Sequence, residues 1–230
     1  MATAVYIAAA VLPAVFLMVY IYRQDKVEKE PGGLLLKLIF AGVLSAFAAI
    51  VLEQAADYVM SMFKYSSETD YLIKSAVSVG IAEEASKLFF LYHGSWNDHN
   101  FNYLFDGVVY AVFVSLGFAA LENVFYVFSY GLSVALPRAL LSIPGHMCFA
   151  VFMGLFYGTA KKHDIYGRVK ERKRDLFLAF LIPAFFHSFY DACAMVESDT
   201  SMTIFAIFIL IMYGLAYALI RRTSKKDKEF

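Results

Sequence analysis

The chain has 230 residues, of which 60% are hydrophobic and only 17% are charged, and its mean hydropathy is +0.61. A soluble fold of this length has more surface than so few polar residues can cover, so the composition excludes a soluble enzyme and a disordered chain. The 20 basic and 20 acidic residues give zero formal net charge, which leaves no positive surplus for binding nucleic acid. An integral membrane protein remains.

Seven apolar segments are long enough to cross a bilayer as helices, because a hydrocarbon core of about 30 Å needs about 20 helical residues. In chain order they are 3–22, 34–60, 71–92, 105–130, 136–160, 176–196 and 202–220. The linkers are short, and the sequence contains no repeat or low-complexity stretch. We therefore predict an all-α, polytopic transmembrane helix bundle. Residues 1–230 form a single transmembrane domain in this interpretation, with a candidate catalytic core at 71–196.

Lys and Arg residues are concentrated in three regions, 23–33, 161–175 and the tail after residue 220. Seven spans place all three regions on one side of the membrane, which the positive-inside rule identifies as cytoplasmic. The first apolar run is followed, not preceded, by basic residues, which favours a transmembrane helix over a cleaved signal peptide. The predicted topology has the N-terminus outside and the C-terminus inside, with the basic loop and tail against anionic lipid.

Ionisable side chains occur in four consecutive predicted helices, where they are costly unless they face the bundle interior or a water-filled cavity. A rise of about 1.5 Å per residue places them in one slab, at the helix midpoints or somewhat toward the outer side. The set is Glu83, Glu84, Lys87, Glu122, His146, His187 and Asp191, with Asn123 beside Glu122. Alternate helices run in opposite directions, so the agreement in depth is informative and predicts a single polar cluster.

Spacing along the helices refines this cluster. Glu83 and Lys87 are four residues apart, as are His187 and Asp191, so each pair shares a helix face. Lys87 can neutralise one carboxylate of the Glu83–Glu84 pair, which leaves the other available as an acid or base.

The cluster has the groups needed to hydrolyse a peptide bond in either of two ways. Zinc could be held by His146, His187 and Glu122, or by Asp191 in place of Glu122, with a glutamate as base. Without a metal, a glutamate activates water directly while a histidine and Asn123 hold the developing oxyanion. Spacing alone equally allows a small ion- or proton-coupled transporter that uses Glu, His and Asp as a relay, or a non-catalytic scaffold held by interhelical hydrogen bonds.

Four motifs in this region, taken together, resemble those of the PrsW-type intramembrane proteases, which are related to the CAAX prenyl proteases. They are Glu83-Glu84-Ala-Ser-Lys87, Gly117-Phe118-Ala-Ala-Leu-Glu122-Asn123, Pro144-Gly145-His146 and His187-Ser-Phe-Tyr-Asp191. The chain departs from the CAAX pattern at Lys87, which replaces an arginine, at Glu122, which replaces a histidine, and in its additional His146. The first and third departures are typical of PrsW-type members.

The resemblance implies a multi-pass protease of the bacterial cell membrane. It implies a first, regulated cut in a single-span anti-sigma factor, which starts the release of a sigma factor in a stress response. It assigns Glu83 and Glu84 to the essential glutamate pair and His187 to the essential histidine. Lys87, Asn123 and Asp191 are expected to support the site, and the use of Zn²⁺ stays open.

Overall fold

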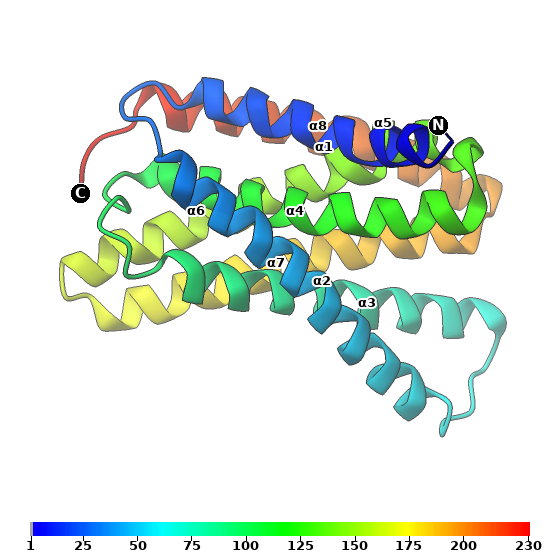
Figure 1. The fold of residues 1–230 in the computed structure, drawn as a ribbon. Coiled ribbons are helices and arrows are strands. Elements are labelled where there is room, and N and C mark those ends of the chain that lie inside the picture. The colour runs from blue at the N-terminus through cyan, green and yellow to red at the C-terminus, as the bar shows by residue number, and fades with distance from the viewer. Residues whose placement is uncertain (1) are drawn as a thin grey trace.

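The structure, a computed structural model, describes residues 2–230, and its regular elements in that range are all helices (Figure 1). The long helices are α1 (Ala2–Gln24), α2 (Gly32–Met60), α3 (Glu68–Ser95), α4 (Leu104–Tyr130), α6 (Ser142–Ile165), α7 (Val169–Val196) and α8 (Asp199–Lys225). A 3₁₀ turn, η1 (Leu132–Val134), and the short helix α5 (Ala135–Leu140) connect α4 to α6. The predicted all-α polytopic bundle is confirmed.

Six stretches among the described residues are long and apolar enough to cross a membrane. They are α1, α2, α4, α7, α8 and the stretch Leu132–Ile165, which contains α5 and α6. The remaining long helix, α3, contains Glu83, Glu84 and Lys87, and these charges lower its hydropathy. It has 28 residues and runs alongside the other long helices (Figure 1), so we retain it as the seventh span of the predicted topology.

The predicted span 136–160 is interrupted in the structure. Helix α5 ends at Leu140, Leu141 has φ −117° and ψ −62°, and α6 begins at Ser142. The cause is Pro144, which has no N–H to donate to Leu140 and whose ring would clash with that carbonyl in a continuous helix. In the first turn of a new helix the missing donor costs nothing. The break turns α5 across the end of α4, which positions Arg138.

Helix α4 forms the centre of the bundle, where most of its residues are buried. Gly107 on α4 lies directly against Gly154 and Gly158 on α6, and a Cβ atom added at Gly107 would lie 2.6 Å from the Gly154 carbonyl oxygen. The interpretation of Gly154 and Gly158 as a close helix-packing step is therefore confirmed. This contact fixes α4 and α6, which contribute Glu122 and His146 to the polar cluster.

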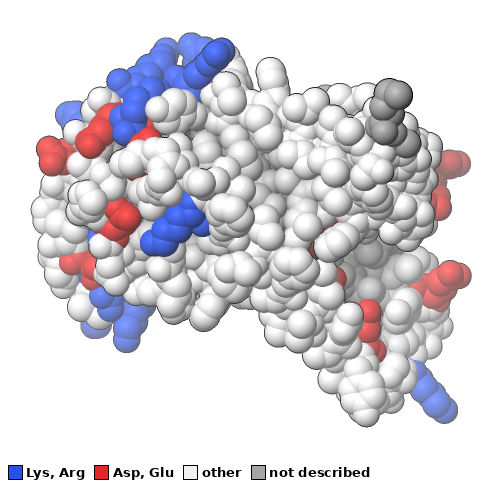
Figure 2. Space-filling model, in the orientation of Figure 1, with Lys and Arg blue, Asp and Glu red and all other residues white. Residues whose placement is uncertain are grey.

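The outer half of α2 packs much less tightly than its inner half. Its buried residues end at Ala49, and none of the residues from there to Met60 is buried. In Figure 1 this half of α2 and the beginning of α3 diverge from α4. Most of the visible Lys and Arg side chains gather at the opposite end of the molecule, where the α6–α7 connection and the C-terminus lie (Figures 1 and 2).

Candidate active site

A cavity of about 590 Å³ opens at the end of the bundle where α2 diverges from α4. In Figure 2 the surface is hollowed between the two lobes at this end. Apolar side chains from α2 and α4, including Ile50 and Phe125, form part of the wall. The ionisable side chains that line the cavity are Glu53, Glu83, Glu122, Arg138, His146, His187 and Asp191.

Glu83 and Glu84 are held by the same cation but face different surroundings. The Lys87 Nζ lies 2.9 Å from Glu83 Oε2 and 2.8 Å from Glu84 Oε1, and the lysine is fully buried. Glu83 lines the cavity, whereas Glu84 lies behind it at 0% exposure, and its Oε2 has no hydrogen-bond partner. Adjacent residues of α3 thus give one carboxylate that can meet a substrate and one that cannot reach it.

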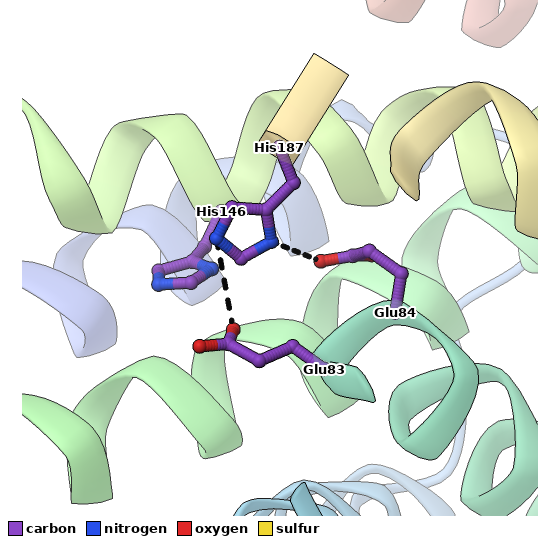
Figure 3. A group of neighbouring side chains, drawn as sticks. All are labelled: Glu83, Glu84, His146 and His187. Carbon is purple, nitrogen blue, oxygen red and sulfur yellow. Dashed lines mark hydrogen bonds and ion pairs between the residues drawn. The ribbon is translucent and has the colours of Figure 1, made fainter. Parts of the chain in front are cut away.

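His187 contacts both glutamates (Figure 3). Its Nδ1 lies 2.9 Å from Glu84 Oε1, while its Nε2 lies 3.7 Å from Glu83 Oε2 and 3.5 Å from Asp191 Oδ2. The last two distances are too long for direct hydrogen bonds. They leave room for a bound atom between His187, Glu83 and Asp191. The Phe149 ring stacks on the imidazole with centroids 4.9 Å apart and limits its rotation.

His146 lies on the other side of Lys87, with both ring nitrogens engaged. Nδ1 is 3.2 Å from Lys87 Nζ, and Nε2 is 3.1 Å from Glu122 Oε2. The same Glu122 oxygen lies 2.6 Å from Arg138 Nη2. A continuous polar network therefore crosses the bundle from Arg138 on α5 to Asp191 on α7.

The donors suit a metal only in part. The ligand atoms of Glu83, Glu84, His146 and His187 lie within 4.8 Å of one another, which makes them a potential metal-binding group. His146 has no free nitrogen, however, since Lys87 and Glu122 engage both. Two ligands of a tetrahedral zinc ion lie about 3.3–3.6 Å apart, because each metal–ligand bond is about 2.0–2.2 Å. The spacings from His187 Nε2 to Glu83 and to Asp191 come close to this value.

The predicted ligand set of His146, His187 and Glu122 is revised accordingly. Of these three residues only His187 has a nitrogen free to bind a metal, because His146 and Glu122 hydrogen-bond each other. The chemically suitable donors are His187 Nε2 and the carboxylates of Glu83 and Asp191.

Asn123 also departs from its expected place. Its Nδ2 donates to the Ala10 carbonyl on α1 at 2.8 Å, and its Oδ1 accepts from Arg138 Nε at 2.7 Å. Asn123 is fully buried and is not part of the cavity wall, so we assign it no contact with a developing oxyanion. The other predicted cluster residues lie together in the network.

Sequence reasoning missed Arg138 as a member of the site. It lies in a short helix between the spans, and we had considered it only as a surface partner of Glu53 or Asp57. The signal that could have found it is its position: a lone arginine six residues before Pro144, in a stretch otherwise apolar from Gly131 to Ile143.

The fold and this site define a membrane-embedded peptidase: a polytopic helix bundle with a glutamate and a histidine at one interior cavity. Residues 30–219 match the family described as PrsW family intramembrane metalloprotease, and the chain belongs to that family.

Proteins named Protease PrsW are similar to nearly the whole chain. The one from Halalkalibacterium halodurans is 30% identical over 222 residues, which cover 96% of this chain and 98% of the relative. The one from Geobacillus kaustophilus is 35% identical, covering 80% of this chain and 77% of the relative. The one from Bacillus subtilis is 32% identical, covering 80% of each chain. No solved structure matches the chain.

Proposed function

We propose that this protease makes the first, regulated cut in a single-span anti-sigma factor, on the outer side of the bacterial inner membrane. The observation that carries the proposal is the pair formed by Glu83 and His187, which face one cavity inside the bundle with Glu83 Oε2 and His187 Nε2 3.7 Å apart. A water molecule between them is within reach of a base and of a second polar group. We place the N-terminus outside and the C-terminus inside, so that the cavity opens outward.

Glu83 is the general base in this proposal. Its carboxylate accepts a proton from the water, the hydroxide adds to the scissile carbonyl, and the protonated Glu83 then returns the proton to the leaving amine. Lys87 keeps Glu83 ionised before the reaction, because the ammonium lies 2.9 Å away in a buried setting. Water and peptide are consumed, and a carboxylic acid and an amine are released.

Glu84 and Asp191 position His187. Glu84 accepts a hydrogen bond from His187 Nδ1, which turns Nε2 toward the cavity. Asp191 lies on the far side of Nε2, and the two carboxylates together favour a charged ring. The ring then donates to the oxyanion that forms during attack. When a metal such as Zn²⁺ is bound by His187, Glu83 and Asp191, it supplies Lewis-acid polarisation of the same carbonyl.

The substrate reaches this cavity from the side, between α2 and α4. The wall there consists of Ile50 and Glu53 on α2 and Phe125 and Tyr126 on α4. Because the outer half of α2 has no buried residue, moving it costs little apolar contact. A transmembrane segment can enter through this side and present an extended peptide bond to Glu83.

The test is cleavage of a tagged single-span anti-sigma factor in proteoliposomes by purified wild type and by Glu83→Gln. We expect wild type to cut and Glu83→Gln to lose about 100-fold or more in rate, the usual effect of removing a general base. Glu68→Gln, at an exposed position in the first turn of α3, is the matched control and should keep full activity. Equal cleavage by wild type and Glu83→Gln would remove Glu83 from the chemistry. Failure of wild type to cut any anti-sigma factor would contradict the proposed substrate.

A further inference from the structure

Arg138 lies outside the four sequence motifs, yet it touches the polar network at three points. Its Nη2 is 2.6 Å from Glu122 Oε2, its Nε donates to Asn123 Oδ1 at 2.7 Å, and its guanidinium stacks over the Tyr126 ring at 3.8 Å. Its side chain is only 14% exposed. An arginine fixed on so many sides carries a defined orientation to its carboxylate partner.

The hydrogen positions of the network follow from Lys87. An ammonium has three N–H donors and no acceptor. Its three close partners are Glu83 Oε2, Glu84 Oε1 and His146 Nδ1. His146 Nδ1 must therefore accept, which leaves the ring proton of the neutral imidazole on Nε2. That proton is donated to Glu122 Oε2, the oxygen that Arg138 also holds.

We propose that Arg138 is a positioning residue of the active site, which fixes the Nε2–H tautomer of His146 by holding Glu122. The order of contacts is Arg138 to Glu122, Glu122 to His146, and His146 to Lys87. Lys87 in turn holds both glutamates. The consequence for catalysis rests on the proposed function, but the coupling itself is a property of the hydrogen bonds.

Removing the guanidinium is expected to act along this path. Glu122 loses its only Lys or Arg ion-pair partner among the described residues, and its carboxylate is free to rotate. His146 Nε2 then loses a fixed acceptor, and the ring can present either nitrogen to Lys87. A misplaced Lys87 moves Glu83 away from the water position, although Arg138 touches neither residue.

The first experiment is nitrogen-15 NMR of histidine-labelled protein in nanodiscs, with the His146 signals assigned by difference from His146→Asn. Wild type should show His146 neutral with its proton on Nε2. Arg138→Gln should give a mixture of tautomers, and Arg138→Lys should restore a large part of the wild-type signal. Arg221→Gln, at an exposed arginine of α8, is the control and should change nothing. If Arg138→Gln remains folded with an unchanged His146 signal, the coupling is wrong.

The second experiment measures steady-state cleavage by the same variants. Arg138→Gln should lower kcat about 10- to 100-fold, as for other residues that orient catalytic groups, and change KM by less than about 3-fold. Glu122→Gln should lower kcat similarly, and the double variant should lose no more than the larger single loss. An unchanged kcat, or fully additive losses, would overturn the positioning role.

The two experiments separate this inference from the proposed function. The tautomer measurement needs no substrate, so failure of wild type to cut an anti-sigma factor refutes only the proposed substrate. If Arg138→Gln does not fold, Arg138→Lys decides the coupling, because it keeps the charge but has only one nitrogen. A wild-type His146 signal and an unchanged kcat in Arg138→Lys would then count against the need for a guanidinium.

Discussion

Two groups of buried carboxylates lie at different depths of this bundle, and they are balanced in opposite ways. At the cavity, Glu83 and Glu84 share Lys87, and Glu122 has Arg138. Near the basic end, Asp25, Glu30 and Asp106 are 1%, 3% and 1% exposed. Within residues 2–230, no Lys or Arg side chain forms an ion pair with any of these three.

The second group is satisfied by hydroxyl and backbone donors instead. Tyr110 donates its hydroxyl hydrogen to Glu30 Oε2 at 2.8 Å, and the Tyr103 N–H donates to Asp106 Oδ2 at 2.7 Å. Burial raises the pKa of Asp25 to about 6 and that of Glu30 to about 7. Protons balance this group, whereas fixed cations balance the other. Fixed cations beside a cavity keep carboxylates charged for chemistry, while a closed, protonated group contributes to structure.

The largest expected effect contrasts the activity of the two groups. His187→Gln should reduce cleavage by at least about 100-fold, because it removes the group opposite Glu83 in the cavity. Asp106→Asn, at a carboxyl that caps the start of α4, should leave the rate of folded protein within about 3-fold. Rates are compared at equal amounts of folded protein in proteoliposomes. A comparable loss in both variants would erase the functional difference between the groups.

The next effect concerns stability. Lys87→Met leaves two buried carboxylates without their cation and should cost about 3–5 kcal/mol of unfolding free energy. Lys74→Met is a matched control on the same helix, since its ion pair with Asp70 is on the surface, and should cost less than about 1 kcal/mol. Thermal unfolding in one detergent compares the two variants. Equal melting temperatures would show that the charge balance at the cavity is not needed.

The proton-balanced group predicts a pH dependence. A carboxyl whose folded pKa is raised stabilises the fold fully below its unfolded pKa, and the contribution is lost as pH rises through the folded pKa. For Glu30 that window runs from the model value of 4.5 to about 7. Wild type should therefore melt about 2–6 °C higher at pH 5 than at pH 8. Glu30→Gln should reduce this difference, whereas an unchanged pH profile would speak against a protonated Glu30.

The smallest effect tests a single hydrogen bond. Tyr110→Phe removes the donor to Glu30 and should cost about 0.5–1.5 kcal/mol without affecting the cleavage rate. Tyr217→Phe, at an exposed tyrosine of α8, should be neutral. Unfolding measurements at pH 8, where Glu30 is ionised, give the clearest comparison. A loss of cleavage in folded Tyr110→Phe would connect the two groups after all.

The active-site cluster could be predicted from the sequence because its geometry is mostly local. Helical spacing places Glu83 with Lys87 and His187 with Asp191, and the depth of each residue in its span follows from the rise per residue. Side-chain direction was less accessible. The inward turn of Glu84, the cavity-facing side of Glu83 and the capture of Asn123 by Ala10 depend on how the helices are rotated against each other.

The second carboxylate group could not be predicted in this way. Asp25 and Glu30 lie in the α1–α2 connection, and Asp106 lies at the start of α4, so only tertiary packing brings them together. Sequence analysis placed Asp106 at the membrane interface, but the structure buries it. The position of Arg138 was hidden for a similar reason, because it depends on the break at Leu141 rather than on a helical repeat.

The contact between Lys87 and His146 has a consequence for how this protein depends on its bilayer. It joins α3 to α6 across 3.2 Å, and α6 is fixed to α4 by the close glycine contacts. A slide of α3 by one residue, about 1.5 Å, is enough to break it. Helix tilt and axial position respond to hydrocarbon thickness at a cost of fractions of a kcal/mol per Å. Lipid chain length therefore becomes a physical input to the alignment of the catalytic carboxylates.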